Sequence, residues 1–146
     1  MAEITEATEV DDELVSAMAR LVRQLSRSAP EPTVAEVAEM VGSPASRLLV
    51  ARPDGGGPII GTLTLAVFRI PTGVRAWIED VVVDEAGRSQ GVGTALITAA
   101  LRVAAEVGAR TVDLTSRPSR EAANRLYRSL GFVLRETNVY RVELRS

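Results

Sequence analysis

The stretch Arg88-Ser89-Gln90-Gly91-Val92-Gly93-Thr94 decides how this chain is interpreted. Its two glycines let backbone N–H groups approach a ligand closely, and the helix predicted to start here adds partial positive charge. This combination is typical of a cradle for a phosphate or pyrophosphate group. The same glycines could instead do no more than shape a turn between a strand and a helix, and the pair alone does not decide between the two interpretations.

The segments on either side of this turn predict a β-α-β unit. Residues 75–83 end in a run of valines, as in a strand buried on both faces. From residue 91 to residue 107 apolar side chains recur at helical spacing, and Gly108 stands where such a helix would end. Residues 110–115 form the second strand of the unit, so at least two strands are expected to be parallel.

The rest of the chain supplies further elements around this unit. Strands are predicted over residues 3–8, 46–52, 59–70, 132–134 and 139–144, and helices over residues 11–27, 33–41 and 119–130. The expected N-caps of these helices are Asp11 or Asp12, Thr33 and Ser119. The predicted fold class is α+β, with a central mixed, mostly antiparallel sheet, a parallel β-α-β core and about four helices, in a single domain over residues 1–146.

Three residue types bear on the chemistry through their absence from the sequence. It contains no Cys, no His and, since all 17 basic residues are Arg, no Lys. A thiol nucleophile, a Cys/His zinc site, a Ser-His-Asp triad and a Schiff base are therefore excluded, and no metal is expected. The net charge of −2 and the dispersed arginines argue against nucleic acid as a partner, and the short apolar runs argue against a membrane span. A cytoplasmic location is expected.

Two other phosphate-binding motifs fit the turn less well. A P-loop requires a Lys, which the chain lacks. A dinucleotide fold requires a third glycine three residues after Gly93, where Leu96 stands. Asp113 lies near the position of the acid that binds ribose in such folds. However, residues 84–90 lie between the strand and the glycines, and this connection is too long for a dinucleotide-binding turn. Binding of NAD(P) is therefore ranked below the two functions that the remaining motifs indicate.

Two separate motifs point to one family. Arg88, Gly91 and Gly93 match the pattern R/Q-x-x-G-x-G/A, and residues 123–132, which read Ala-Asn-Arg-Leu-Tyr-Arg-Ser-Leu-Gly-Phe, match A-x-x-L-Y-x-x-x-G-F. Together with the strand over residues 78–84, they make the chain similar to the GCN5-related N-acetyltransferase (GNAT) family across residues 75–134. The chain departs from the family at Arg120, where many members carry Asn.

The resemblance implies acetyl-CoA as the cosubstrate and a primary amine, of a small molecule or a peptide, as the acceptor. In the family, the pyrophosphate sits on the glycine turn, and the pantetheine arm bonds the preceding strand as an added strand would. Arg120 could pair with a phosphate in place of the family's Asn. The residues implied in cofactor binding are Val81, Val82, Val83, Arg88, Ser89, Gln90, Gly91, Val92, Gly93, Thr94, Arg120 and Asn124. A homodimer is common in the family.

The resemblance also implies two catalytic residues, Glu79 and Tyr127. An alkyl ammonium titrates at about 10, so it must lose a proton before it attacks, and Glu79 is the candidate base, directly or through water. Tyr127 is the candidate acid for the departing CoA thiolate. Strand alternation predicts Trp77 and Glu79 on one face and Val82 on the other. Plainer roles stay open, with Glu79 in solvent and Trp77 and Tyr127 as packing residues.

Direct transfer in a ternary complex is the expected mechanism, since the chain has no Cys to carry an acetyl group. The main alternative is a non-catalytic acyl-CoA-binding or sensing module. Such a module would need the glycine turn but neither Glu79 nor Tyr127, so the presence of Tyr127 favours the enzyme.

Overall fold

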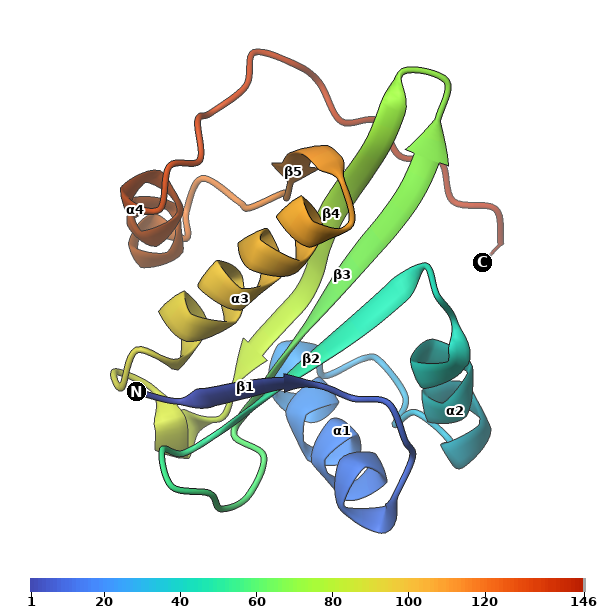
Figure 1. Cartoon of the computed structure of the whole chain (residues 1–146), viewed down its shortest axis with the longest axis vertical. Helices are drawn as coiled ribbons and strands as arrows, with labels where there is room; N and C mark the ends of the chain where they lie inside the picture. Colours follow the sequence, from blue (N-terminus) through green and yellow to red (C-terminus); the bar gives the residue numbers. More distant parts are fainter. Residues whose placement is uncertain (146) are drawn as a thin grey trace. The chain divides into compact units, whose positions relative to one another are not determined.

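The computed structural model describes residues 1–145 and divides the chain into two compact units, Met1–Thr115 and the residues from Ser116 onward. The first unit starts at the blue end of the ribbon in Figure 1, and the second unit ends at its red end. Among residues 1–145, no helix has the length and apolar run needed to cross a bilayer.

The first unit is built on one five-stranded sheet with the order β1-β2-β3-β4-β5. Its strands are β1 (Glu3–Glu6), β2 (Ser46–Arg52), β3 (Gly61–Ile70), β4 (Gly73–Val83) and β5 (Ala109–Asp113). Neighbouring strands pair antiparallel from β1 to β4, and β4 pairs with β5 in parallel. The predicted mixed, mostly antiparallel sheet with a parallel β-α-β core is confirmed.

Helices cover both faces of this sheet. Figure 1 shows α1 (Asp12–Leu25) and α2 (Val34–Gly42) on one face and α3 (Val92–Glu106) on the other. Asp11 caps α1 by accepting a hydrogen bond from the Leu14 amide at 2.8 Å. Thr33 and Glu36 form a reciprocal capping box at the start of α2. Both predicted caps are confirmed, although α2 includes Gly42 instead of ending before it.

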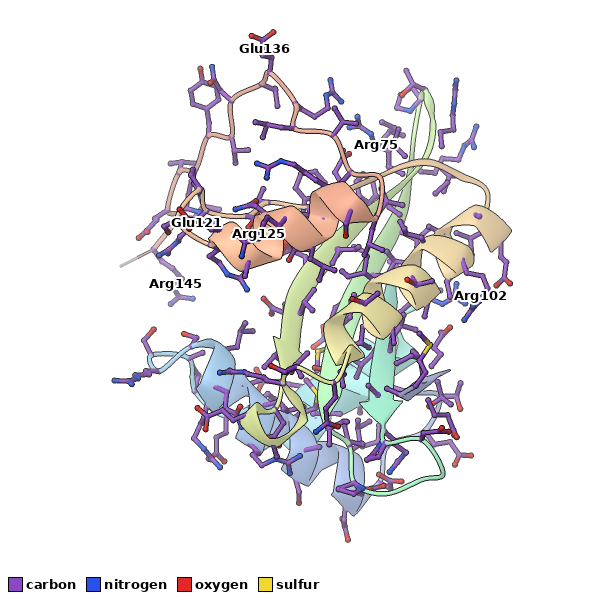
Figure 2. All side chains as sticks on the ribbon, turned by 90° about the vertical axis from the view of Figure 1, so that its left-hand side faces the viewer. Arg75, Arg102, Glu121, Arg125, Glu136 and Arg145 are labelled. Atoms are coloured by element: carbon purple, nitrogen blue, oxygen red, sulfur yellow. The ribbon has the colours of Figure 1, made fainter. Side chains whose placement is uncertain are left out.

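Each face of the sheet carries its own apolar layer. On the α1 side, Leu14 and Leu21 pack in one cluster with Val82 of β4. On the α3 side, Gly61 allows a close approach, because a Cβ at this position would lie 3.1 Å from Val92 and 3.2 Å from Leu96. The opposite side of α3 carries residues such as Arg102, which points away from the sheet in Figure 2. Helix α3 is therefore held directly against β3, and this contact positions the turn that precedes it.

A bulge in β4 changes which of its residues share a face. Glu79 pairs with Thr64 and Val82 pairs with Thr62, so two β4 residues lie opposite the one β3 residue between these pairs. One of the two, Asp80, has a positive φ of 47°. Because Thr62 and Thr64 share a face, Glu79 and Val82 share one too. The prediction that alternation separates Glu79 from Val82 is wrong, since it assumed a regular strand.

The second unit departs furthest from the prediction. Helix α4 (Glu121–Ser129) begins after Arg120 without a side-chain cap, so Ser119 is not its N-cap. From the end of α4 to residue 145 there is no strand, and the predicted strands over residues 132–134 and 139–144 are therefore wrong. Most of their apolar side chains are exposed, to 81% at Val133 and 92% at Leu144, while Phe132 is half-buried. A segment of alternating polarity forms a strand only where a neighbouring strand supplies hydrogen-bond partners. Residues 116–145 contain no strand that could pair with these segments.

Candidate functional site

The turn between β4 and α3 is exposed and has an unusual backbone. A single 3-10 turn, η1 (Glu85–Gly87), follows β4, and residues 88–91 lead from it into the helix. Ser89 has a φ of 68° and Gly91 a φ of 76°, both in the left-handed region. Gly91 is the N-cap of α3, with no side-chain cap, and a Cβ built there would meet nothing within 4 Å. The backbone at Gly91 therefore faces open space.

The backbone N–H groups of this turn lack acceptors. Among residues 1–145, the amides of the six residues from Ser89 to Thr94 donate to no partner, while the Gly91 carbonyl accepts from the Ala95 amide at 3.0 Å. A run of open donors at the positive end of a helix suits an anion. The structure therefore brings the predicted turn residues together as a possible anion cradle, and their contact with a cofactor stays a prediction.

The side chains of the turn differ in what they can offer a ligand. Arg88 Nε donates to the Val83 carbonyl at 3.3 Å, and Gln90 Nε2 donates to the Ala86 carbonyl at 3.2 Å. Both side chains are exposed and fold back onto the backbone that precedes the turn. Val92 is only 2% exposed and packs into the core. Of the predicted binding residues, Val92 can therefore contribute its amide but not its side chain.

The second half of β4 presents an unpaired edge next to this turn. Parallel pairing with β5 runs from Val74 to Trp77 and stops where β5 ends, at Asp113. β4 continues to Val83, so in the described chain its last six positions have a strand neighbour on the β3 side alone. An unpaired edge can accept an extended ligand as an added strand. Residues 81–83, predicted to contact the cofactor, lie on this edge.

Glu79 lies on the same half of β4, on the face that α1 covers. Its side chain is exposed and accepts a hydrogen bond from the indole Nε1 of Trp77 at 3.1 Å. Trp77 is half-buried and is paired with Asp113 of β5. The indole orients the Glu79 carboxylate and leaves it open to solvent. This arrangement suits a group that exchanges a proton with a substrate or with water.

Three predicted site residues, Arg120, Asn124 and Tyr127, lie in the second unit. The Tyr127 ring is half-buried and packs edge-to-face against Phe132, with the ring centres 5.9 Å apart. Asn124 Nδ2 donates to the carbonyls of Arg117 and Arg120 at 2.9 and 2.8 Å, which holds the chain at the entry to α4. The Arg120 side chain is exposed. The catalytic role of Tyr127 and the binding roles of Arg120 and Asn124 stay predictions.

Three polar residues whose side chains meet at the entry to the turn were not predicted from the sequence. Asp84, directly after β4, accepts hydrogen bonds from Arg20 Nε at 3.0 Å and Gln24 Nε2 at 3.3 Å, both on α1. Burial raises the pKa of the Asp84 carboxyl, but hydrogen bonds from Gln24, the Ala86 amide and Arg20 outweigh burial and hold that pKa below its usual value. Arg20 and Gln24 are 64 and 60 residues away from Asp84 in the sequence. The one available signal was the spacing between Arg20 and Gln24, which places both on the same face of a helix.

The open turn offers backbone donors that suit an anion, and the unpaired edge of β4 offers main-chain groups that suit an extended ligand. The sequence model of the acetyltransferase (GNAT) family matches residues 14–132, and the chain therefore belongs to this family. The match confirms the resemblance carried by the two sequence motifs. A search of curated proteins finds no significant match.

Solved structures with a similar fold include several acetyltransferases. A provisionally assigned acetyltransferase from Agrobacterium tumefaciens strain C58 is 26% identical, with a TM-score of 0.84 over 97% of this chain and 99% of that one. A protein of Bacillus halodurans C-125 described as a transcriptional regulator is 30% identical, with a TM-score of 0.76 over 98% and 100%. An aminoglycoside N-acetyltransferase in complex with CoA is 19% identical, with a TM-score of 0.79 over 99% and 95%, and shares the fold.

Proposed function

We propose that this protein is an N-acetyltransferase that moves an acetyl group from acetyl-CoA to a small-molecule or peptide amine by direct transfer in a ternary complex. The observation that carries the proposal is the run of open amides at the start of α3. Membership of the GNAT family supports acyl transfer in general. We treat residues 1–146 as one acetyltransferase domain, because the family match extends on both sides of residue 115.

The donor site is assigned to the glycine turn and the edge of β4. The amides of residues 89–94 suit the negative charge of a pyrophosphate, and no acidic residue stands within this run. Arg88 adds a positive charge beside it. The open edge over residues 81–83 offers main-chain partners to the amides of the pantetheine arm. Arg120 and Asn124 are the further binding candidates.

Acetyl-CoA supplies an activated thioester, and the chain supplies the proton transfers. Glu79 accepts a proton from the ammonium, directly or through water, and passes it on to solvent. The neutral amine nitrogen then bonds to the acetyl carbon as the C–S bond breaks, and it loses its second proton to water. The Tyr127 hydroxyl is the candidate donor of a proton to the departing thiolate. Tyr127 then regains a proton from solvent.

Binding and turnover measurements test this proposal. Calorimetric titration with acetyl-CoA tests the donor site, and a panel of primary amines is then screened for release of the CoA thiol. The protein gives no background with a thiol reagent, because it contains no Cys. With an accepted amine, double-reciprocal plots are expected to intersect. Parallel lines, or a trapped acetyl-Ser or acetyl-Tyr, would contradict direct transfer, and lack of acetyl-CoA binding would contradict the donor site.

A non-catalytic acyl-CoA-binding or sensing module is the second candidate. It is favoured by one observation, the description of the 30% identical Bacillus halodurans protein as a transcriptional regulator. Such a module would bind acetyl-CoA but release no thiol with any amine, and Glu79 and Tyr127 would be dispensable. Thermal stabilisation by NADH and not by acetyl-CoA would instead support dinucleotide binding.

A further inference from the structure

A polar network joins helix α1 to the residue that opens the glycine turn. Arg20 and Gln24 stand one helical turn apart on α1, and both reach Asp84. Arg20 Nε donates to Asp84 Oδ2 at 3.0 Å, and its Nη2 donates to the Ile59 carbonyl at 2.6 Å. Gln24 Nε2 donates to Asp84 Oδ1 at 3.3 Å, while Gln24 Oε1 accepts from the Glu85 amide at 3.1 Å. One helix therefore holds both Asp84 and the residue after it.

The carboxylate of this network is more enclosed than the carboxylates of the other ion pairs in the described chain. The Asp84 side chain is 17% exposed, whereas the acidic partners of the other ion pairs are 31% exposed or more, and Arg20 itself is 41% exposed. The Ala86 amide is a third donor to this carboxylate, at 3.4 Å. Both polar atoms of the Gln24 side chain are engaged. Water competes less for contacts that are shielded in this way, so they hold their partners more firmly.

This network acts on the segment that leads into the open amides. The Asp84 amide donates to the Ile60 carbonyl at 2.8 Å. Gly87 is buried against Ile60, where a Cβ on the glycine would lie 3.3 Å from Ile60 Cδ1. Residues 84–87 are thus held by Ile60 and by two side chains of α1. The amides of residues 89–94 follow after one residue, Arg88, so their direction depends on this anchored segment.

We propose that Arg20, Gln24 and Asp84 are positioning residues for the donor site, and that they hold the entry of the turn so that its amides are arranged for the pyrophosphate of CoA. The inference rests on the proposed function, because it assumes that CoA binds at the turn. The effect is indirect, since the three side chains engage protein groups and are not among the predicted cofactor contacts. Donors that are already ordered bind more tightly, because binding then costs less conformational entropy.

Calorimetry with CoA tests this inference on the wild type, Arg20→Met, Asp84→Asn and the double variant. Met keeps part of the apolar stem of Arg and removes the guanidinium. Each single variant is expected to raise the Kd for CoA about tenfold, as loss of a hydrogen bond to a charged group implies. The double variant is expected to bind about as weakly as either single one, because both remove the same network. Gln24→Ala is the milder variant, with a smaller expected rise.

Arg52→Met is the matched control. Arg52 donates two hydrogen bonds of 2.8 Å to the carboxylate of Glu13, which is also on α1, and one of 2.8 Å to the Gly57 carbonyl. The control therefore removes a guanidinium network of the same kind between the same helix and the sheet, with no bond to the turn. We expect a loss of thermal stability similar to that of Arg20→Met and an unchanged Kd for CoA.

The outcomes separate this inference from the proposed function. If the wild type binds CoA and the folded network variants bind it equally well, the positioning role alone is overturned. An equal rise in Kd for Arg52→Met also overturns it, since the effect would then follow from any weakening of α1. If Arg20→Met and Asp84→Asn do not fold, Gln24→Ala decides, and an unchanged Kd in it overturns the role. Failure of the wild type to bind CoA overturns both proposals.

Discussion

Helices α2 and α3 begin in opposite ways. At α2, the Thr33 hydroxyl accepts from the Glu36 amide at 3.1 Å, and the Glu36 carboxylate accepts from the Thr33 amide at 2.9 Å. At α3, Gly91 offers no side chain, and the amides of residues 89–94 find no acceptor in the part of the chain that the structure describes. Every helix leaves its first amides without internal partners, and these two helices meet that requirement differently.

This difference shows that a helix can leave its first amides without acceptors when other contacts stabilise it. A side-chain cap stabilises a helix by about 1 kcal/mol, and α3 forgoes it at an exposed turn. Burial of one face stabilises α3 instead, since seven of its residues are buried, against only Val37 in α2. A helix anchored in this way can leave its end available to an anion.

The largest expected effect on CoA binding comes from a carboxylate introduced at the start of α3. Gly91→Asp places a carboxylate beside the open amides, where it repels a pyrophosphate. Its backbone is left-handed, with a φ of 76°, unlike the extended backbone of the capping residue Asp11. We expect the Kd for CoA to rise about 100-fold or more, measured by calorimetry. Gly91→Asn has the same shape and the same backbone strain but no charge, so its effect is expected to be smaller. An unchanged Kd in folded Gly91→Asp protein would make the turn purely structural.

The next prediction concerns the hydroxyl of Tyr127, which lies outside the open start of α3. Tyr127→Phe keeps the ring that packs against Phe132 and removes the hydroxyl. If Tyr127 is the general acid, kcat is expected to fall about 100-fold or more, with the Kd for acetyl-CoA and the thermal stability nearly unchanged. Thiol release with an accepted amine measures kcat under conditions where the chemical step limits the rate. A near-normal kcat would leave Tyr127 as a packing residue.

The closed end of α2 provides the opposite test. Thr33→Ala removes the cap, and the free energy of unfolding is expected to fall by about 1 kcal/mol, measured by urea denaturation. The Kd for CoA is expected to stay the same, because the capping box is assigned no ligand. A large change in CoA affinity would show that the start of α2 also affects ligand binding, and that the two helix starts do not differ in role as proposed.

The smallest expected effect is pH-dependent and concerns Asp84. Because its folded-state pKa is lowered, the carboxylate stabilises the folded protein above its ordinary pKa, and this contribution is lost as the pH falls through the lowered value. We expect the wild type to be more stable than Asp84→Asn at about pH 6 and the difference to shrink below about pH 4. Urea denaturation of both proteins across this range measures it. A difference independent of pH would argue that the charge of Asp84 plays no part.

Features that depend on neighbours along the chain were predictable. The limits of β2 agree with the predicted residues 46–52, and the capping box at Thr33 follows from a spacing of three residues. The predicted strands after residue 131 failed, because alternating polarity does not provide a partner strand. The face of Glu79 was assigned without the bulge near Asp80, which arises in the pairing of β4 with β3.

By itself, the sequence determined the family, the place of the glycine turn and the caps of α1 and α2, because each depends on residues close together in the chain. Only the tertiary structure decided that Glu79 shares a face with Val82 and that β4 loses its β5 neighbour after Trp77. It also decided that Asp84 is held from α1. These features join residues far apart in the chain, and their register is set by strand pairing and helix packing, which no local pattern encodes.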